Sequence, residues 1–133
     1  MLHLSRYINI NRVGINMNKP KIGMIGLGSI AQKAYLPTLT KETDWNFVGA
    51  FTPNAEKRKQ VCQQYRIQDF HSIEMLASEC DAIFVHSSTA SHYEIVSELL
   101  KKGIDVYVDK PLAATVEQAE QLVELSEKYN RKL

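Results

Sequence analysis

The strongest constraint on this chain is a pair of glycines, Gly26 and Gly28, at the junction between a strand-like and a helix-like hydrophobic pattern. The short apolar run Lys21–Gly26 is typical of a buried strand. A helical pattern follows at Ser29–Thr40, and Pro37 is expected to distort or shorten that helix. The junction reads Gly26-Leu27-Gly28-Ser29-Ile30-Ala31, a G-x-G-x-x-A motif. The first glycine permits a tight turn, the second lets a pyrophosphate come close, and the alanine lets the helix pack on the strand. The motif predicts a dinucleotide-binding turn, and a turn needed only for packing is the alternative.

Strand-like and helix-like segments alternate along the rest of the chain, which predicts an α/β fold with a doubly wound parallel sheet. Further strands are expected at Asn46–Phe51, Asp69–His71, Ala82–Val85 and Ile104–Val108. Further helices are expected at Asn54–Tyr65, Ile73–Ser78, Thr89–Lys102 and Thr115 to about Tyr129, with caps at Asn54, Ser72 and Thr115. The last helix is expected to bury Ala119, Leu122, Val123 and Ser126. Such a sheet usually continues into another strand, so we expect it to be incomplete at its C-terminal edge and able to self-associate there.

Length and composition are those of one globular domain. The chain has 133 residues, 44% of them hydrophobic, and its net charge of +1 gives no indication of a nucleic-acid partner. It has no apolar run of membrane-spanning length, and its two cysteines form neither a disulfide framework nor a metal-ligand spacing. These features predict a cytoplasmic protein that has no metal site. Residues 1–18 follow no sustained pattern and are expected to be a disordered or non-native extension before a domain at residues 19–133.

The end of the second expected strand carries no acidic residue. Sheets that bind NAD usually have an acid there, which holds the ribose 2′-hydroxyl. Here Thr52 and Asn54 follow the strand, and Lys57 and Arg58 come soon after. A hydroxyl with a nearby cation suits a 2′-phosphate, so the sequence favours NADP over NAD. The alternative is that these cations only form the solvated face of a helix. The missing acid also disfavours an adenosylmethionine-dependent enzyme.

Polar residues also follow the fourth and fifth expected strands, where ligands of parallel sheets bind. In the stretch from His86 to His92, the serines are candidates to line a cofactor crevice, and His92 is either a cofactor contact or a helix-start residue. His86 is expected to be a hydrogen-bonded core histidine, and Ser91-x-x-Glu94 is a possible capping box. Lys110 follows the fifth strand and is a candidate to hold a cofactor ribose or polarise a substrate oxygen. A structural Asp–Lys pair with Asp109 is the alternative.

Together these segments resemble the Gfo/Idh/MocA family of nicotinamide-dependent oxidoreductases. Gly26–Leu39 is similar to the family's first loop and helix. Ser87-Ser88-Thr89-x-x-His92 lies where the family has T-P-N-x-x-H, and Asp109-Lys110-Pro111 lies where it has E-K-P. Ser88 thus replaces a proline and Asp109 a glutamate. The stretches FVHSSTASH and VDKPLA are most similar to a bacterial branch labelled as virulence factors, and the resemblance covers about Lys19 to Leu133.

The resemblance implies how each segment would be used. The dinucleotide would be held at its pyrophosphate by Gly26, Gly28, Ser29 and Ile30, and its nicotinamide side would be lined by Ser87, Thr89 and His92. Lys110 would lie near the nicotinamide ribose and the substrate as the catalytic candidate, and Thr52, Asn54 and Lys57 match a variant associated with NADP.

Members of the family are more than twice as long as this chain. Their second domain supplies dimerisation, most substrate contacts and the acid/base residue. The expectation is therefore the N-terminal NAD(P)-binding domain of an oxidoreductase that acts on a sugar- or polyol-type substrate, without the C-terminal domain. The alternative is a non-catalytic stub that only binds the dinucleotide.

Overall fold

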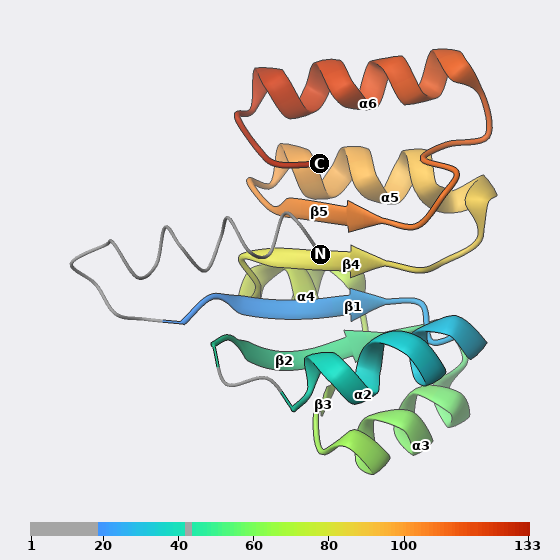
Figure 1. Ribbon diagram of the computed structural model, residues 1–133, viewed down its shortest axis with the longest axis vertical. Coiled ribbons are helices and arrows are strands. Elements are labelled where there is room, and N and C mark those ends of the chain that lie inside the picture. Colours follow the sequence, from blue (N-terminus) through green and yellow to red (C-terminus); the bar gives the residue numbers. More distant parts are fainter. Residues whose placement is uncertain (1–18, 42–43) are drawn as a thin grey trace.

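The computed structural model describes residues 19–41 and 44–133 (Figure 1). The N-terminal extension expected at residues 1–18 lies outside the described residues.

In the part of the chain that the structure describes, a five-stranded, fully parallel sheet forms the centre of the domain, in the order β3-β2-β1-β4-β5. The strands are β1 (Lys21–Ile25), β2 (Asn46–Phe51), β3 (Gln68–Asp69), β4 (Ala82–Val85) and β5 (Asp105–Val108). The chain enters the sheet at β1, continues outward through β2 to β3, and then crosses back to β4 on the other side of β1. This is the predicted doubly wound sheet, and the switch in direction opens a crevice at the carboxyl ends of β1 and β4.

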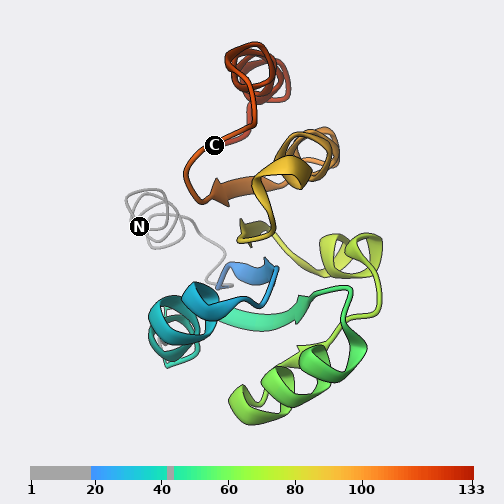
Figure 2. The ribbon, with the colours of Figure 1, turned by 90° about the vertical axis from the view of Figure 1, so that its right-hand side faces the viewer.

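Helices cover both faces of the sheet. They are η1 (Ala31–Tyr35), α2 (Leu36–Leu39), α3 (Ala55–Tyr65), α4 (Ile73–Glu79), α5 (Thr89–Lys101) and α6 (Val116–Lys128). Figure 2 shows α2 on one side of the sheet and α4 and α5 on the other. Each side has its own apolar core, one built with Leu36 and Leu39 and the other with Leu76, Leu99 and Leu100. β1 contributes to both cores because successive side chains of a strand point to opposite faces.

The helix expected at Ser29–Thr40 is distorted, as Pro37 predicts. Its middle, Ala31–Tyr35, is a π-helical segment, in which the amide of Leu36 donates to the carbonyl of Ala31. Pro37 lies in the first turn of α2 and has no N–H to donate. The widened turn therefore falls directly before the proline.

The predicted caps are confirmed, whereas one predicted core residue is wrong. The side chains of Asn54, Ser72 and Thr115 each accept a backbone N–H from the residue three positions later. Leu122 and Ser126 are buried in α6, but Val123 is 44% exposed. α6 packs on α5 at the margin of the domain, so it buries only a narrow stripe and Val123 lies beside that stripe.

The sheet ends at β5, as expected. The residues after α6 return along the outer edge of this strand, where the amide of Val106 donates to the carbonyl of Lys132 over 2.9 Å. The amide of Lys132 donates to the Asp105 carboxylate over 2.8 Å.

Candidate functional site

The structure explains one of the two glycines of the first loop by packing, but not the other. Gly26 has φ +92°, and a Cβ there would lie 2.6 Å from the carbonyl carbon of His86 and 2.7 Å from the amide of Ser87. The fold itself therefore requires glycine at this position. Gly28 is exposed, and a Cβ there would meet nothing within 4 Å. Packing explains Gly26 but not Gly28, and open space beside backbone is what a closely approaching ligand needs.

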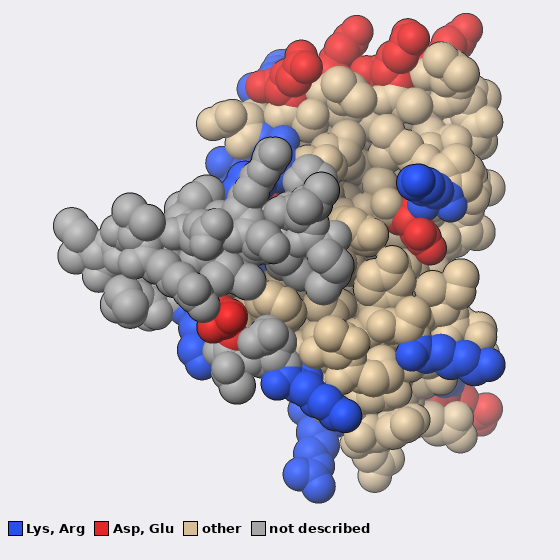
Figure 3. Space-filling model, in the orientation of Figure 1, with Lys and Arg blue, Asp and Glu red and all other residues tan. Residues whose placement is uncertain are grey.

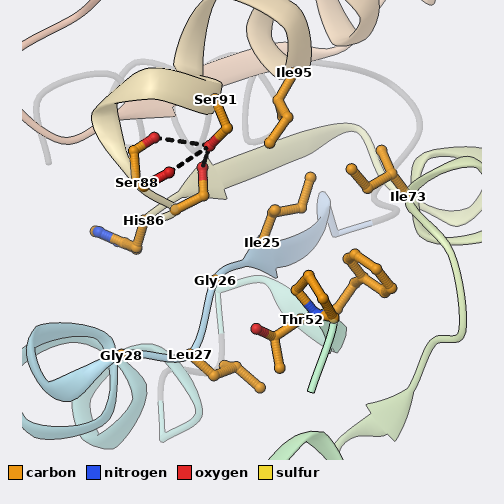
Figure 4. Close-up of a pocket in the computed structure, with 13 residues that line it drawn as sticks. Ile25, Gly26, Leu27, Gly28, Thr52, Ile73, His86, Ser88, Ser91 and Ile95 are labelled. Atoms are coloured by element: carbon orange, nitrogen blue, oxygen red, sulfur yellow. Dashed lines mark hydrogen bonds between the residues drawn. The ribbon is translucent and has the colours of Figure 1, made fainter. Parts of the chain in front are cut away.

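A cavity of about 420 Å³ opens beside these glycines, at the carboxyl ends of β1, β2 and β4 (Figure 4). Four of the predicted site residues line it: Gly26, Gly28, Thr52 and Ser87. Apolar side chains outside the predicted site residues line it as well: Ile25, Leu27, Phe51, Pro53, Ile73 and Ile95. The cavity thus combines a glycine turn, hydroxyl groups and an apolar wall, a usual composition for a small-molecule site.

The polar groups at the end of β2 are largely committed to the fold. Asn54 caps α3 through its side-chain oxygen, and Lys57 is exposed on the first turn of that helix. Arg58 is only 7% exposed, forms an ion pair with Asp69, and donates to the carbonyl of Thr52 over 3.0 Å. Arg58 therefore does not belong to a solvated helix face, and Lys57 remains the accessible cation of the predicted pair.

Hydroxyl groups cluster at the end of β4. Ser91 donates to the Oγ of Ser87 over 2.9 Å and contacts the carbonyl of Ser88 at 2.7 Å (Figure 4). The possible capping box at Ser91 is wrong, because α5 begins at Thr89 with Ser88 as its N-cap residue. Ser91 lies inside the first turn, so its hydroxyl turns back to the loop.

The side chains of the two histidines of the segment after β4 are both buried. His92 lies in the first turn of α5, which fits its alternative as a helix-start residue. His92 is 1% exposed, with Nδ1 2.9 Å from the carbonyl oxygen of Pro111 and Nε2 3.0 Å from that of Ser87. His92 thus joins the loops after β4 and β5, and it does not line the cavity. The prediction for His86 is wrong: its side chain is 3% exposed, but neither ring nitrogen has a hydrogen-bond partner among the described residues.

Lys110 lies in the loop after β5, outside the cavity lining, and it is exposed. Its backbone N–H donates to Oδ1 of Asp109 over 3.2 Å. The other oxygen of Asp109 lies 3.6 Å from Nδ1 of His86. Three more predicted residues, Ser29, Ile30 and Thr89, also stay outside the lining; Ile30 is 59% exposed.

Burial and neighbouring groups shift the pKa values of one histidine, one tyrosine and both cysteines of the domain. Burial lowers the pKa of His86, and the nearby Asp109 only partly opposes this effect. A hydrogen bond with Tyr107, followed by burial, raises the pKa of Tyr35 to about 12. Burial raises the pKa of the free thiols Cys62 and Cys80 to about 11 and 12. At neutral pH these groups are therefore uncharged.

Charge is unevenly distributed over the surface. On the face in Figure 3, Asp and Glu side chains gather over α6, and Lys and Arg are more frequent on the half that carries η1 and α2. Within the described residues, no group of three His, Cys, Asp or Glu side chains could hold a metal ion. No helix in residues 19–41 and 44–133 is long and apolar enough to cross a bilayer.

Comparison with known proteins identifies this arrangement. Residues 20–133 match the model of an oxidoreductase family with an NAD-binding Rossmann fold, GFO_IDH_MocA. The chain belongs to the Gfo/Idh/MocA family. Its matched part is the NAD-binding domain of that family, so the cavity beside Gly28 lies where the fold binds its dinucleotide.

Three relatives illustrate how similar the chain is to known proteins and how much of each it covers. YceM of Salmonella typhimurium, an oxidoreductase by name, is 53% identical over 110 residues, which are 83% of this chain and 36% of YceM. The crystal structure of the dehydrogenase MviM from Clostridium difficile superposes with a TM-score of 0.83 at 64% identity, over 84% of this chain and 37% of MviM. An inositol 2-dehydrogenase of Paracoccus denitrificans is 30% identical over 118 residues, 85% of this chain and 35% of that enzyme. The chain thus spans little more than a third of the length of these relatives.

Proposed function

We propose that this chain binds NADP(H) as the cofactor domain of an oxidoreductase that transfers a hydride to or from a sugar- or polyol-type substrate. The observation that carries the proposal is the exposed Gly28 backbone, which borders the cavity and faces open space. In a dinucleotide-binding sheet, such a position lets the pyrophosphate approach the first loop and the helix that follows it.

The described residues fit this cofactor. Gly26 and Gly28 would border the pyrophosphate from the cavity lining. Ser29 and Ile30 would offer it their backbone N–H groups at the start of the helix. The apolar wall with Ile73 and Ile95 would receive a flat apolar ring. Ser87 would reach the nicotinamide side directly. Thr89 and His92 would support that side from the start of α5, because His92 holds the carbonyl groups of Ser87 and Pro111.

The proposal favours NADP over NAD at the end of β2. Thr52 lines the cavity and Lys57 is exposed nearby, while Asn54 shapes the turn between them as the cap of α3. The nearest acid from the neighbouring strand, Asp69, is paired with Arg58 and so repels a phosphate less. A 2′-phosphate would therefore meet a hydroxyl group and a lysine.

In the reaction, the nicotinamide would supply the hydride acceptor or donor. Lys110 would place an ammonium group near the ribose and the substrate oxygen, where a positive charge favours the alkoxide-like form of that oxygen. Because the chain spans little more than a third of its relatives, we assign most substrate contacts and the acid/base residue to the part of such a protein beyond this domain. On its own, the chain is expected to bind the cofactor without turnover.

A fluorescence titration of the purified chain with NADPH and NADH tests the binding. Gly28→Val should weaken NADPH binding by about 100-fold or more, because its side chain would fill the space a pyrophosphate needs. It should leave the melting temperature within about 2 °C. Gln121→Val, on an exposed position of α6, is the matched control and should bind as the unaltered chain does. Saturable binding that survives Gly28→Val unchanged would refute the assignment of the loop.

The alternative function, a dinucleotide-binding domain that never takes part in catalysis, makes a different prediction. A protein that carries this domain together with a substrate domain should oxidise polyols or sugars, and loss of Lys110 should abolish that activity. If such a protein binds NADPH but turns over no sugar or polyol, the non-catalytic function is favoured.

The part of the outer edge of β5 that the Val106–Lys132 hydrogen bond does not occupy supports one further expectation, which is weak self-association by strand pairing. Analytical ultracentrifugation over a range of concentrations measures it. The free thiols of Cys62 and Cys80 support a reducing, cytoplasmic location.

A further inference from the structure

Two histidines hold the residues on either side of Lys110. His92 contacts the carbonyl oxygen of Pro111, and His86 faces the carboxylate of Asp109. His86 directly follows β4 and His92 lies in the first turn of α5, so the loop that carries Lys110 is held from one neighbouring segment of the chain. The strand register explains the pairing: Val85 lies opposite Val108, and the amide of Asp109 donates to the carbonyl of Val85 over 3.2 Å.

The ring of His86 is fixed by aromatic neighbours. It stacks on Phe84 with 9° between the ring planes, and the ring of Tyr35 lies 4.5 Å away between centroids. Tyr107 closes the box at 6.5 Å. Packing of this kind is what a phenyl ring would provide equally well, so the nitrogen atoms need a separate explanation.

A buried imidazole without hydrogen bonds carries a desolvation penalty, and native proteins rarely leave such groups unused. Nδ1 of His86 is aimed at Oδ2 of Asp109, at 3.6 Å, which is an electrostatic contact longer than a hydrogen bond. Oδ1 of the same carboxylate already accepts the N–H of Lys110. Asp109 therefore links the buried ring to the backbone of Lys110.

We propose that His86 is a positioning residue, which orients the carboxylate of Asp109 and through it the backbone of Lys110. The Asp109 side chain is 38% exposed, and in the described part of the chain it contacts the N–H of Lys110 and the ring of His86, so the ring nitrogen selects which way the carboxylate turns. The effect on the loop is independent of any ligand. The effect on NADPH binding rests on the proposed function, in which Lys110 lies near the ribose.

Two variants of His86 separate positioning from packing. His86→Phe keeps an aromatic ring in the box and removes the nitrogen. His86→Asn packs poorly, but its amide nitrogen takes the place of Nδ1. In the full chain, we expect His86→Phe to weaken NADPH binding by about fivefold to tenfold, comparable to the net contribution of one ordinary hydrogen bond. We expect His86→Asn to bind within about twofold of the unaltered chain, despite a lower melting temperature.

An NMR measurement without ligand decides the question separately. The backbone amide signal of Lys110 should shift in His86→Phe and stay near its original position in His86→Asn. The reverse result, with the Lys110 signal shifted in His86→Asn and unchanged in His86→Phe, would overturn the inference and leave packing as the role of His86. Equal behaviour of the two variants would overturn it as well. If the unaltered chain fails to bind NADPH, the proposed function is lost, and the Lys110 signal still decides the role of His86.

Discussion

Two buried basic side chains, Arg58 and His86, lie on opposite sides of β1, and each faces a carboxylate. Arg58 is fully engaged: it pairs with Asp69, donates to the carbonyl of Thr52, and lies 5.8 Å above the ring of Phe51. His86 has an aromatic box, but in residues 19–41 and 44–133 its ring nitrogens have no hydrogen-bond partner, and Oδ2 of Asp109 lies 3.6 Å from Nδ1.

This difference indicates how the two ends of the cavity are prepared for a ligand. The end near β2 is held by satisfied polar contacts and needs nothing more to keep its shape. The end near β4 and β5 also has formed hydrogen bonds, those of His92, but it includes one polar contact longer than a hydrogen bond, between His86 and Asp109. Enzymes often keep such groups loose until a ligand tightens them, so the β4–β5 end is where we expect binding to change the structure.

The largest effect should follow from removing Arg58, the buried basic side chain whose contacts are all formed. Arg58→Met would leave Asp69 and the carbonyl of Thr52 without their buried donor, so the free energy of unfolding should fall by about 3 kcal/mol. Urea denaturation measures it. Adding Asp69→Leu should restore part of the loss, because no unpaired charge remains. Lys57→Ala, one residue away and exposed, is the control and should change stability by less than about 0.5 kcal/mol. A loss that small for Arg58→Met would show that the β2 end is not held by this pair.

The next effect concerns the choice of cofactor. Lys57→Ala should weaken NADPH binding by about twentyfold and NADH binding by less than about twofold, because only NADPH carries the 2′-phosphate. Fluorescence titration with both nucleotides gives the two ratios, and Lys59→Ala, also exposed on α3, is the matched control. Equal losses for the two nucleotides would remove the argument for a phosphate site at the end of β2.

The smallest effect is a pH dependence of stability at the β4–β5 end. The folded state lowers the pKa of His86, so below about pH 6.5 the unfolded chain binds more protons and stability decreases as the pH falls. One proton limits the slope to about 1.4 kcal/mol per pH unit. Among the described residues, Asp109, Tyr35, Tyr107 and His92 face this ring, and Asp109 opposes the shift. His86→Phe should reduce the decrease in melting temperature between pH 7 and pH 5. An unchanged slope in this variant would assign the acid sensitivity to another group.

Much of the fold follows from local sequence signals. The capping residues Asn54, Ser72 and Thr115 act within one helical turn, so their neighbours in the sequence are enough to identify them. The apolar run of β4 is buried throughout, and the distortion at Pro37 follows from its missing N–H. The motif at Gly26 and Gly28 also predicts where the cavity lies, because a doubly wound sheet has its crevice at that turn.

The remaining features depend on contacts between distant segments. Arg58 lies between Lys57 and Lys59 in a run of cations typical of a solvated helix face, but its partner Asp69 comes from β3. Ile73 forms part of the cavity wall because α4 crosses the sheet at the switch in strand order. Its position at the start of that crossing helix was the available signal. Whether His86 finds a hydrogen-bond partner depends on the end of β5, more than twenty residues away in the sequence.

The tight packing at Gly26 has a mechanical consequence. Its α-carbon faces the backbone of His86 and Ser87, and no side chain lies between the two loops to act as a compliant layer. A displacement of the β1 loop of even a few tenths of an ångström must move the start of the β4 loop with it. Strain applied at one end of the cavity is therefore transmitted through backbone to the other end, toward His86 and the segment that carries Lys110.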